Sequence, residues 1–417
     1  MKLESKLSKV SNRIKSSIIR ELLKDASLPG IISFGGGVPD PKTFPREKLA
    51  EISSEIINKE YAMTLQYGTT EGDPLLKKEY MKLMEKYYGV DWLHEDNMVF
   101  TVGSQQALYL IGMTFLDEQS WMSASKPIYL GAASAFIQRG PNFINVPLTE
   151  DGMDLDYLEK NLEELKQKGE IENFKFAYVI SNFHNPAGVS MSLDKRRKLI
   201  QLAEKYDFYI VEDDPYGALR FEGDPIPSIY SMAPERTVLL NTFSKVLSPG
   251  LRIGAVMGPK DVIRRITMVK QAADLCSSPL THRLAARYME KYDLVEEIQP
   301  TIKLYAKKKD WMMEALEETF SDIEGIEWVN PEGGLFTWLT LPEGIDTMDM
   351  FPLAKENKVL YIPGEAFYIG EPERNKMRMS FCLPPKEDIF EGIKRLRKTI
   401  ETYCEEKGIE LKIKTKK

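Results

Sequence analysis

The stretch FKFAYVISNFHNPAGVSMSLDKRRKLIQLAEKYDFYIVEDDPYG, residues 174–217, decides the fold. Residues 174–180 form a nearly continuous apolar run, which predicts a strand buried on both faces. Residues 193–206 carry apolar side chains at helical spacing, and residues 207–214 contain a second apolar strand. A buried strand, a helix and another buried strand are typical of a sheet covered by helices on both faces, so we expect an α/β fold.

The same pattern continues along the chain and then changes. Residues 236–243 and 253–258 predict two further strands. Beyond about residue 295, long polar helices alternate with short strands such as GLFTWLTL and KMRMSF, which predicts a smaller α+β domain. We expect three parts: an N-terminal arm and helix at 1–55 that joins the small domain, a large domain at 56–294, and the small domain at 295–417.

Composition and charge argue against several classes of protein. Of the 417 residues, 56 are Lys or Arg and 63 are Asp or Glu, a net charge of 56 − 63 = −7 that disfavours nucleic-acid partners. No apolar run is long enough to cross a membrane, and the charged N-terminus does not predict a signal peptide. The widely spaced Cys276, Cys382 and Cys404 favour a reducing compartment, so we expect a cytoplasmic protein. Abundant Lys and Glu with sparse Gln is a bias of heat-adapted proteins.

Polar clusters follow three of the predicted strands. They are SNFHNPAGVS after the first, EDDPYG at the end of the second and TFSK at the end of the third. Ligands of such sheets bind at the carboxyl ends of the strands, on the loops that follow. This pattern places five side chains at one edge of the sheet: Asn185, Asp213, Tyr216, Ser244 and Lys245.

These residue types are the ones that a pyridoxal phosphate site requires. A lysine amine binds the aldehyde, a carboxylate pairs with the ring nitrogen, and amide or phenol groups contact the ring oxygen. The phosphate needs backbone amides at a helix start, hydroxyls and an arginine. The matching residues are Asn185, Asp213, Tyr216, Thr242, Ser244, Lys245 and Arg252, and TVGSQQ offers a second phosphate contact at Gly103, Ser104 and Gln105.

Nine ordered motifs carry a resemblance to a known family. They include IISFGGGVPDPKTFP, LQYGTTEGDPLLKKEY, TVGSQQALYL, NFHNPAGVSMS, VEDDPYGALRF, TFSKVLSPGLRIG, NPEGGLFTWLTLP, YIPGEAFY and MRMSFCLP. From about residue 10 to about 405 the chain resembles a class I/II aminotransferase of the fold-type I pyridoxal phosphate family. It is most similar to the subgroup of aromatic, kynurenine/2-aminoadipate and multiple-substrate aminotransferases. The resemblance implies a large domain with a mostly parallel seven-stranded sheet covered by helices, plus a small α+β domain.

The resemblance also implies roles around the cofactor. Lys245 would bind the cofactor and transfer the Cα proton of the substrate. Asp213 would pair with the ring nitrogen of the cofactor. Tyr216 would be the third catalytic residue. Tyr216 and Asn185 would contact the ring hydroxyl, and Tyr129 would stack on the ring. The residues implied at the phosphate are Gly103, Ser104, Gln105, Thr242, Ser244 and Arg252.

The implied substrates are an amino acid and a 2-oxo acid. Arg378 would bind the α-carboxylate of the substrate, because the planar guanidinium matches the geometry of a carboxylate. Asn185 and Gly37 would also bind the substrate. Arg20 would meet a distal carboxylate, although a solvent-facing helix arginine is an equal alternative. Tyr67 would reach across the interface of a homodimer and bind the cofactor of the partner chain. The expected reaction is ping-pong transamination between an aromatic, 2-aminoadipate-like or broader range of amino acids and 2-oxoglutarate.

Two segments depart from the family pattern, and two other functions stay open. Ser125-Lys126 precede Pro127 where a glutamate is usual, and SNFHNPAG carries Ser181 for proline and His184 for glutamine. His184 beside the cofactor can shift specificity. A pyridoxal phosphate β-lyase would use the same lysine and aspartate, and a non-catalytic sensor would share the fold. We expect no metal, because the three histidines lack metal-ligand spacing.

Overall fold

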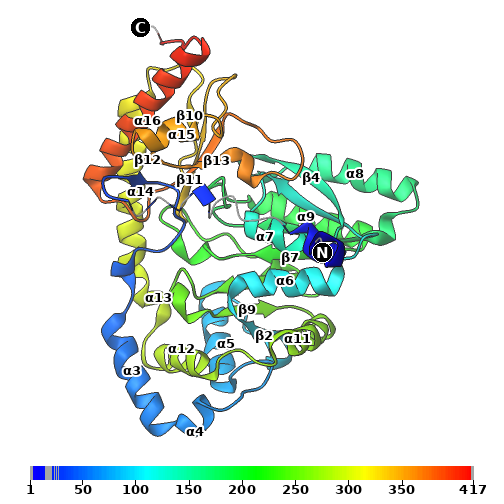
Figure 1. Ribbon diagram of the computed structural model, residues 1–417. Coiled ribbons are helices and arrows are strands. Elements are labelled where there is room, and N and C mark those ends of the chain that lie inside the picture. The colour runs from blue at the N-terminus through cyan, green and yellow to red at the C-terminus, as the bar shows by residue number, and fades with distance from the viewer. Residues whose placement is uncertain (1–2, 15–20, 23, 25, 27, 415–417) are drawn as a thin grey trace.

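The computed structural model describes residues 3–14, 21–22, 24, 26 and 28–414. The large sheet and its helices lie at one end of the molecule, and the last two long helices, α14 (Gln299–Phe320) and α16 (Lys386–Lys407), lie side by side at the other (Figure 1). A smaller sheet lies next to these two helices. In the described part of the chain no helix is both long and apolar enough to span a bilayer.

The large sheet has the order β2-β9-β8-β7-β6-β3-β4-β5. Its strands are β2 (Met98–Thr101), β3 (Trp121–Lys126), β4 (Asn142–Thr149), β5 (Gly152–Met153), β6 (Phe174–Ile180), β7 (Tyr209–Asp213), β8 (Thr237–Thr242) and β9 (Gly254–Met257). The neighbours from β4 to β8 pair in parallel, whereas β9 is antiparallel to both β8 and β2. The mostly parallel α/β sheet predicted from the sequence is confirmed.

The strand count differs from the predicted seven, because the described residues form eight strands in this sheet. The extra strand, β5, contains only two residues and pairs antiparallel with the end of β4 through a short turn. Two residues are too few to show any periodicity of apolar side chains, so the sequence pattern could not reveal this strand.

Helices cover both faces of the large sheet, as continuous apolar strands require. One face packs against α6 (Gly103–Phe115), α7 (Leu130–Ile137) and α11 (Lys260–Asp274). The other face packs against α8 (Leu155–Gln167), α9 (Leu193–Tyr206), α3 (Arg46–Lys59), α5 (Pro74–Tyr88) and α12 (Pro279–Lys291). Alternate side chains of each strand enter the two cores, so Tyr178 and Val211 face α6 and α7, whereas Val179 and Ile210 face α8 and α9.

Local signals define the helix ends. α9 begins after Ser192, whose hydroxyl accepts from the Lys195 amide, and it ends at Asp207, which adopts a left-handed conformation. α5 begins after Asp73, which caps two amides, with Pro74 in the first turn, and it ends at the left-handed Gly89. The predicted ranges 174–180 and 193–206 coincide with β6 and α9.

The small sheet has the order β10-β11-β14-β13, and all its pairs are antiparallel. Its strands are β10 (Glu327–Trp328), β11 (Phe336–Thr340), β13 (Ile362–Pro363) and β14 (Lys376–Ser380). The sheet shares a core with α14, α16 and α15 (Phe351–Glu356). Near the N-terminus, β1 (Ile32–Ser33) pairs in parallel with β12 (Val359–Leu360), so residues 32–33 join the C-terminal part of the fold.

A buried ion pair fixes the glycine-rich loop that follows β1. Lys308 on α14 donates to the Asp40 carboxylate at 2.9 Å and to the Cys382 carbonyl at 2.6 Å. The Tyr305 hydroxyl accepts from the Asp40 amide at 2.9 Å. Lys308 and Asp40 are both buried, so each charge depends on the other for compensation.

We therefore expect Lys308→Ala to lower the free energy of unfolding by about 3–5 kcal/mol, because it leaves the Asp40 carboxylate buried without its cation. Chemical denaturation followed by circular dichroism measures the change. Lys303→Ala on the exposed face of the same helix is the matched control, expected to change stability by less than about 0.5 kcal/mol. Equal effects of the two variants would contradict a structural role for the buried pair.

Candidate active site

Three neighbouring strand ends bring the predicted polar residues together. β6, β7 and β8 are parallel, with Ile180 beside Asp213 and Asp213 beside Leu240. Asp213 is the last residue of β7, and the loops after β6 and β8 carry Asn185 and Lys245. The site therefore lies at the carboxyl edge of the sheet, where the polar clusters predicted it.

Asp213 is a buried carboxylate with one free oxygen. Its Oδ2 atom accepts a hydrogen bond from the Tyr178 hydroxyl at 2.7 Å, and its Oδ1 atom has no partner among the described residues. Burial raises the pKa of Asp213 to about 7. A buried acceptor without a partner is costly, and a protonated ring nitrogen is a donor of the kind that would satisfy it.

Lys245 is a half-buried lysine whose amine faces neutral groups. Its Nζ atom donates to the Gly37 carbonyl at 2.9 Å and lies 5.8 Å from the centre of the Tyr216 ring. Burial lowers the pKa of Lys245 to about 8, and the positive charges of Arg378 and Arg252 act in the same direction. An amine with this pKa is partly neutral near pH 7–8, as a nucleophile or a general base must be.

Asn185 connects Tyr216 with Arg378. Its Nδ2 atom donates to the Tyr216 hydroxyl at 3.4 Å, and its Oδ1 atom accepts from Arg378 Nη1 at 3.0 Å. Asn185 and Tyr216 are both buried. Burial raises the pKa of Tyr216 above its ordinary value, so the phenol stays protonated and can donate a hydrogen bond.

Arg378 is a buried cation without an acidic partner in the described chain. Its guanidinium lies 4.3 Å from the Phe336 ring centre and 5.1 Å from that of Phe367, and Nη2 donates to the Gly35 carbonyl at 2.8 Å. The Nε atom makes no hydrogen bond with any residue that the structure describes. Burial lowers the pKa of Arg378 to about 10, which still leaves it charged at neutral pH. Such a group has the geometry and the unmet charge to bind a carboxylate.

The predicted phosphate residues converge at the start of α6. A Cβ atom on Gly103 would lie 2.4 Å from Arg252 Nη2, and one on Gly254 would lie 2.6 Å from the Gly103 carbonyl carbon. Gly103 also has a φ of +72°, which favours glycine. The Thr242 and Ser244 hydroxyls are 3.0 Å apart on the adjoining strand end. Helix amides, two hydroxyls and an exposed arginine form a suitable anion site.

Tyr129 and Gln105 lie next to this anion site. Gln105 donates to the Gly131 carbonyl at 2.9 Å. A Cβ atom on Gly131 would lie 2.4 Å from the Tyr129 ring and 2.6 Å from the Gln105 side-chain oxygen. Both side chains therefore gather at the start of α7, with Tyr129 half-buried and Gln105 exposed. Ser104, which is half-buried, occupies the first turn of α6.

Two predicted residues are not joined to this group. The Tyr67 side chain is 78% exposed and has no place in the site formed by this single chain. Arg20 lies outside the described residues. Gly37, predicted at the substrate, does lie in the site, because its carbonyl accepts from Lys245 and its Cα faces Phe336 and Arg378.

The two departures from the family pattern contact each other. Ser125, at the end of β3, lies 2.8 Å from His184 Nε2. The His184 Nδ1 atom accepts from the Ala187 amide at 3.4 Å, which leaves Nε2 to donate to the serine. Burial lowers the pKa of His184 to about 3, so the ring is neutral at physiological pH. The pair joins the strand before Tyr129 to the loop that carries Asn185.

Sequence reasoning missed three residues of the site. Tyr178 binds Asp213, and Phe336 and Phe367 enclose Arg378. For Tyr178 a signal existed, because a hydroxyl in an otherwise apolar buried strand needs a partner. For the two phenylalanines no signal existed, because aromatic residues in a small-domain core look alike in sequence.

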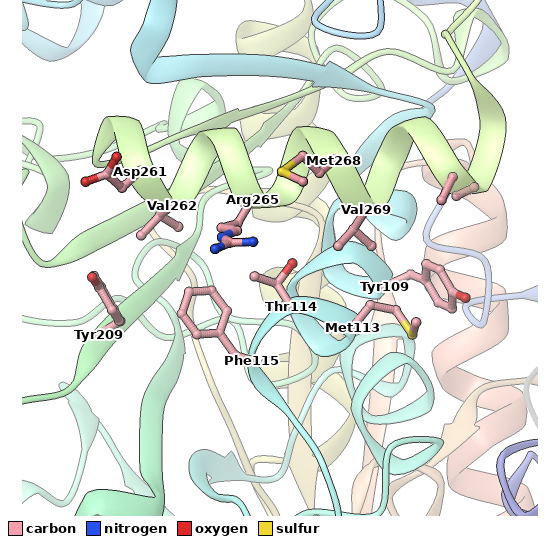
Figure 2. A pocket seen from close by; sticks show the side chains of 12 residues that line it. Tyr109, Met113, Thr114, Phe115, Tyr209, Asp261, Val262, Arg265, Met268 and Val269 are labelled. Carbon is pink, nitrogen blue, oxygen red and sulfur yellow. The ribbon is translucent and has the colours of Figure 1, made fainter.

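A separate groove lies away from these residues. Its volume is about 860 Å³, and it runs between α6 and α11 (Figure 2). The lining is mainly apolar, including Tyr109, Met113, Phe115, Val262 and Met268. None of the site residues that the structure describes lines it, so the chemistry-bearing side chains meet elsewhere.

Comparisons with known proteins identify the family of the chain. The model of the family "Aminotransferase class I and II" matches residues 29–396. An aromatic-amino-acid aminotransferase of Thermococcus litoralis is 43% identical over 93% of this chain and 92% of its own length. A 2-aminoadipate transaminase of Thermus thermophilus is 35% identical over 94% of this chain and 96% of its own.

A solved structure extends the agreement to the fold and the cofactor. Kynurenine aminotransferase of Pyrococcus horikoshii, solved in complex with PMP, is 43% identical and superimposes with a TM-score of 0.91 over 96% of this chain and 98% of its own. PMP is the amino form of pyridoxal phosphate. The predicted fold type and cofactor are thereby confirmed. The chain belongs to the class I and II aminotransferases and is a pyridoxal phosphate-dependent aminotransferase.

Proposed function

We propose that this aminotransferase moves the amino group between an aromatic or 2-aminoadipate-like amino acid and 2-oxoglutarate, in a ping-pong reaction. The observation that carries the proposal is the buried Arg378, which has an unpaired Nε atom and no acidic partner in the described chain. Arg378 is joined through Asn185 to Tyr216 and through the glycine loop to Lys245. A substrate carboxylate at Arg378 would thus lie within the group of catalytic side chains.

The choice of substrate class is supported by the relatives. The similar proteins are named for aromatic amino acids, 2-aminoadipate and kynurenine. Two of these names denote aromatic side chains and one denotes a side chain that ends in a carboxylate. A single site that accepts both kinds needs a cation that can approach or leave the side chain, and Arg20 is our candidate for that cation.

The residues present fit the cofactor, and we propose the following roles. Pyridoxal phosphate, when bound, supplies an aldehyde that accepts the amino group and a ring that stabilises negative charge at the substrate Cα. Asp213 Oδ1 would hold the ring nitrogen, and Asn185 and Tyr216 would donate to the ring hydroxyl. Tyr129 would cover one face of the ring. The phosphate would be held by Gly103, Ser104, Gln105, Thr242, Ser244 and Arg252.

Lys245 would carry out the proton transfer. Its amine has a lowered pKa and therefore can take a proton from the substrate Cα near neutral pH. The Gly37 carbonyl accepts from Nζ and would orient the amine between transfers. Arg378 and Asn185 would hold the substrate carboxylate so that the Cα–H bond faces Lys245.

We also propose a homodimer in which Tyr67 of each chain completes the partner's site. The support is a surface segment rich in exposed apolar side chains, with Tyr61, Met63, Leu65 and Tyr67 between 58% and 78% exposed. Several large exposed apolar side chains in one short segment are typical of an interaction site. We further propose a cytoplasmic location and a division of the chain into an arm at 1–55, a large domain at 56–294 and a small domain at 295–417.

Lys245→Ala should reduce kcat for transamination by about 10²–10⁴-fold or more, because it removes both the nucleophile and the base. The assay follows 2-oxo acid formation from each amino acid with 2-oxoglutarate as acceptor, and glutamate formation in the same mixture. Lys394→Ala, an exposed lysine on α16, is the control and should keep full activity. Ammonia release in place of glutamate formation would contradict a transaminase and favour a β-lyase.

Arg20→Ala should raise the KM for 2-oxoglutarate, glutamate and 2-aminoadipate by about 10–100-fold, because a charged hydrogen bond to the distal carboxylate is lost. The KM for an aromatic amino acid should change little. Steady-state kinetics with both substrate kinds measure the difference, and Arg20→Lys, which keeps the charge without the planar fork, should lie in between. Unchanged KM values for all the dicarboxylates would show that Arg20 does not bind them.

A further inference from the structure

The Asp213 carboxylate receives a single side-chain hydrogen bond from the described residues. The donor is Tyr178, whose hydroxyl lies 2.7 Å from Asp213 Oδ2. Neither residue is open to solvent, since Tyr178 is 1% and Asp213 is 2% exposed. Water is therefore a poor substitute for this donor, and the orientation of the carboxylate depends on the phenol.

The sheet register makes this contact specific. β6 and β7 pair in parallel with Ile180 beside Asp213, so Tyr178, two residues before Ile180, faces the same side of the sheet as Asp213. The Tyr178 ring packs edge-to-face on Phe136 of α7, with ring centres 5.5 Å apart. The strand and the helix thus hold the ring, and the hydroxyl reaches Oδ2 but leaves Oδ1 free.

The direction of the hydrogen bond follows from the chemistry of the two groups. Burial, and then the negative charge of Asp213, raise the pKa of Tyr178 well above its ordinary value. The phenol stays protonated and donates, and the carboxylate accepts. The same bond opposes the effect of burial on Asp213, since it lowers the pKa of that carboxyl group. Tyr178 therefore favours the anionic form of Asp213 in a site that otherwise disfavours charge.

We propose that Tyr178 is a positioning residue that acts through Asp213: it occupies Oδ2, keeps the carboxylate anionic and turns Oδ1 toward the ring nitrogen of the cofactor. This inference rests on the proposed pairing of Asp213 with that nitrogen. It adds a residue on a neighbouring strand that never touches the cofactor but sets how strongly the ring nitrogen holds its proton. The strength of the ring as an electron acceptor depends on that proton.

The test replaces Tyr178 with phenylalanine, which keeps the ring and its packing on Phe136. We expect Tyr178→Phe to weaken pyridoxal phosphate binding by about 10–100-fold in a fluorescence titration of the apoenzyme, because one hydrogen bond to a buried charge is lost. With cofactor labelled with ¹⁵N in the ring, the nitrogen resonance should move toward that of an unprotonated pyridine. We expect kcat to fall by a similar factor, with a smaller change in the KM for the amino acid.

The matched control is Tyr230→Phe. Tyr230 is also a fully buried tyrosine, but its hydroxyl has no hydrogen-bond partner in the described part of the chain, and it packs in the core on the other face of the sheet. Removal of this hydroxyl should leave the cofactor affinity and the ¹⁵N resonance unchanged. A shift of the resonance in this variant as large as in Tyr178→Phe would overturn the proposal, because any buried phenol would then act alike.

Asp213→Ala separates the failure of this inference from that of the proposed site. If Asp213→Ala leaves cofactor affinity and the ring resonance unchanged, the proposed pairing of Asp213 with the ring nitrogen is wrong, and the inference falls with it. If Asp213→Ala impairs both but Tyr178→Phe impairs neither, only the role of Tyr178 is wrong. In the double variant, Tyr178→Phe should add little to Asp213→Ala. Full additivity would show that Tyr178 acts through packing and not through Asp213, and would also overturn the inference.

Discussion

Three ionisable side chains meet where the carboxyl edge of the large sheet faces the small sheet, and each lacks a counter-charge from the described chain. Asp213 and Arg378 are buried, and Lys245 is half-buried. The partner of Asp213 is the neutral phenol of Tyr178, and the partner of Lys245 is a backbone carbonyl. Arg378 contacts a backbone carbonyl, the side-chain amide of Asn185 and two aromatic rings. To bury charge without compensation is expensive. The sheet and its two helical layers make this arrangement possible, because their apolar cores hold the strand ends in place whether or not a ligand is bound. Under the proposed function, the protonated ring nitrogen of the cofactor would pair with Asp213, and the carboxylate of the substrate would pair with Arg378.

The contacts of the glycine loop show how three distant parts of the chain form one site. The loop after β1 supplies the carbonyls of Gly35 and Gly37 to Arg378 and Lys245, and the buried pair of Asp40 and Lys308 holds the loop on α14. Asn185 from the large sheet then reaches across to Arg378 on the small sheet. The position of the Arg378 guanidinium relative to the Lys245 amine therefore depends on elements from the beginning, the middle and the end of the chain. A shift of the loop would move both cations together.

Ser125 and His184 depend on each other for a hydrogen bond in the protein interior. Each residue by itself departs from the family pattern, and neither departure has an evident purpose in the sequence. In the structure the neutral imidazole donates to the serine hydroxyl between the end of β3 and the loop after β6. The two side chains bind each other, so the Ser125 hydroxyl and the His184 Nε2 atom are both paired in the interior. A buried polar group is tolerated when its partner changes with it.

By itself, the sequence determined β6 and α9, the α/β class, and the residue types of the proposed pyridoxal phosphate site, because apolar periodicity and the polar residues at strand ends are local patterns. It did not reveal the two-residue strand β5, which is too short to carry a period. The tertiary structure alone decided which groups meet: Tyr178 with Asp213, Ser125 with His184, and Asn185 with Arg378, which are 35, 59 and 193 residues apart. Such pairs depend on strand register and on the packing of one sheet against the other. Neither strand register nor sheet packing can be predicted from a short stretch of the chain, because both arise only when distant apolar surfaces are buried together.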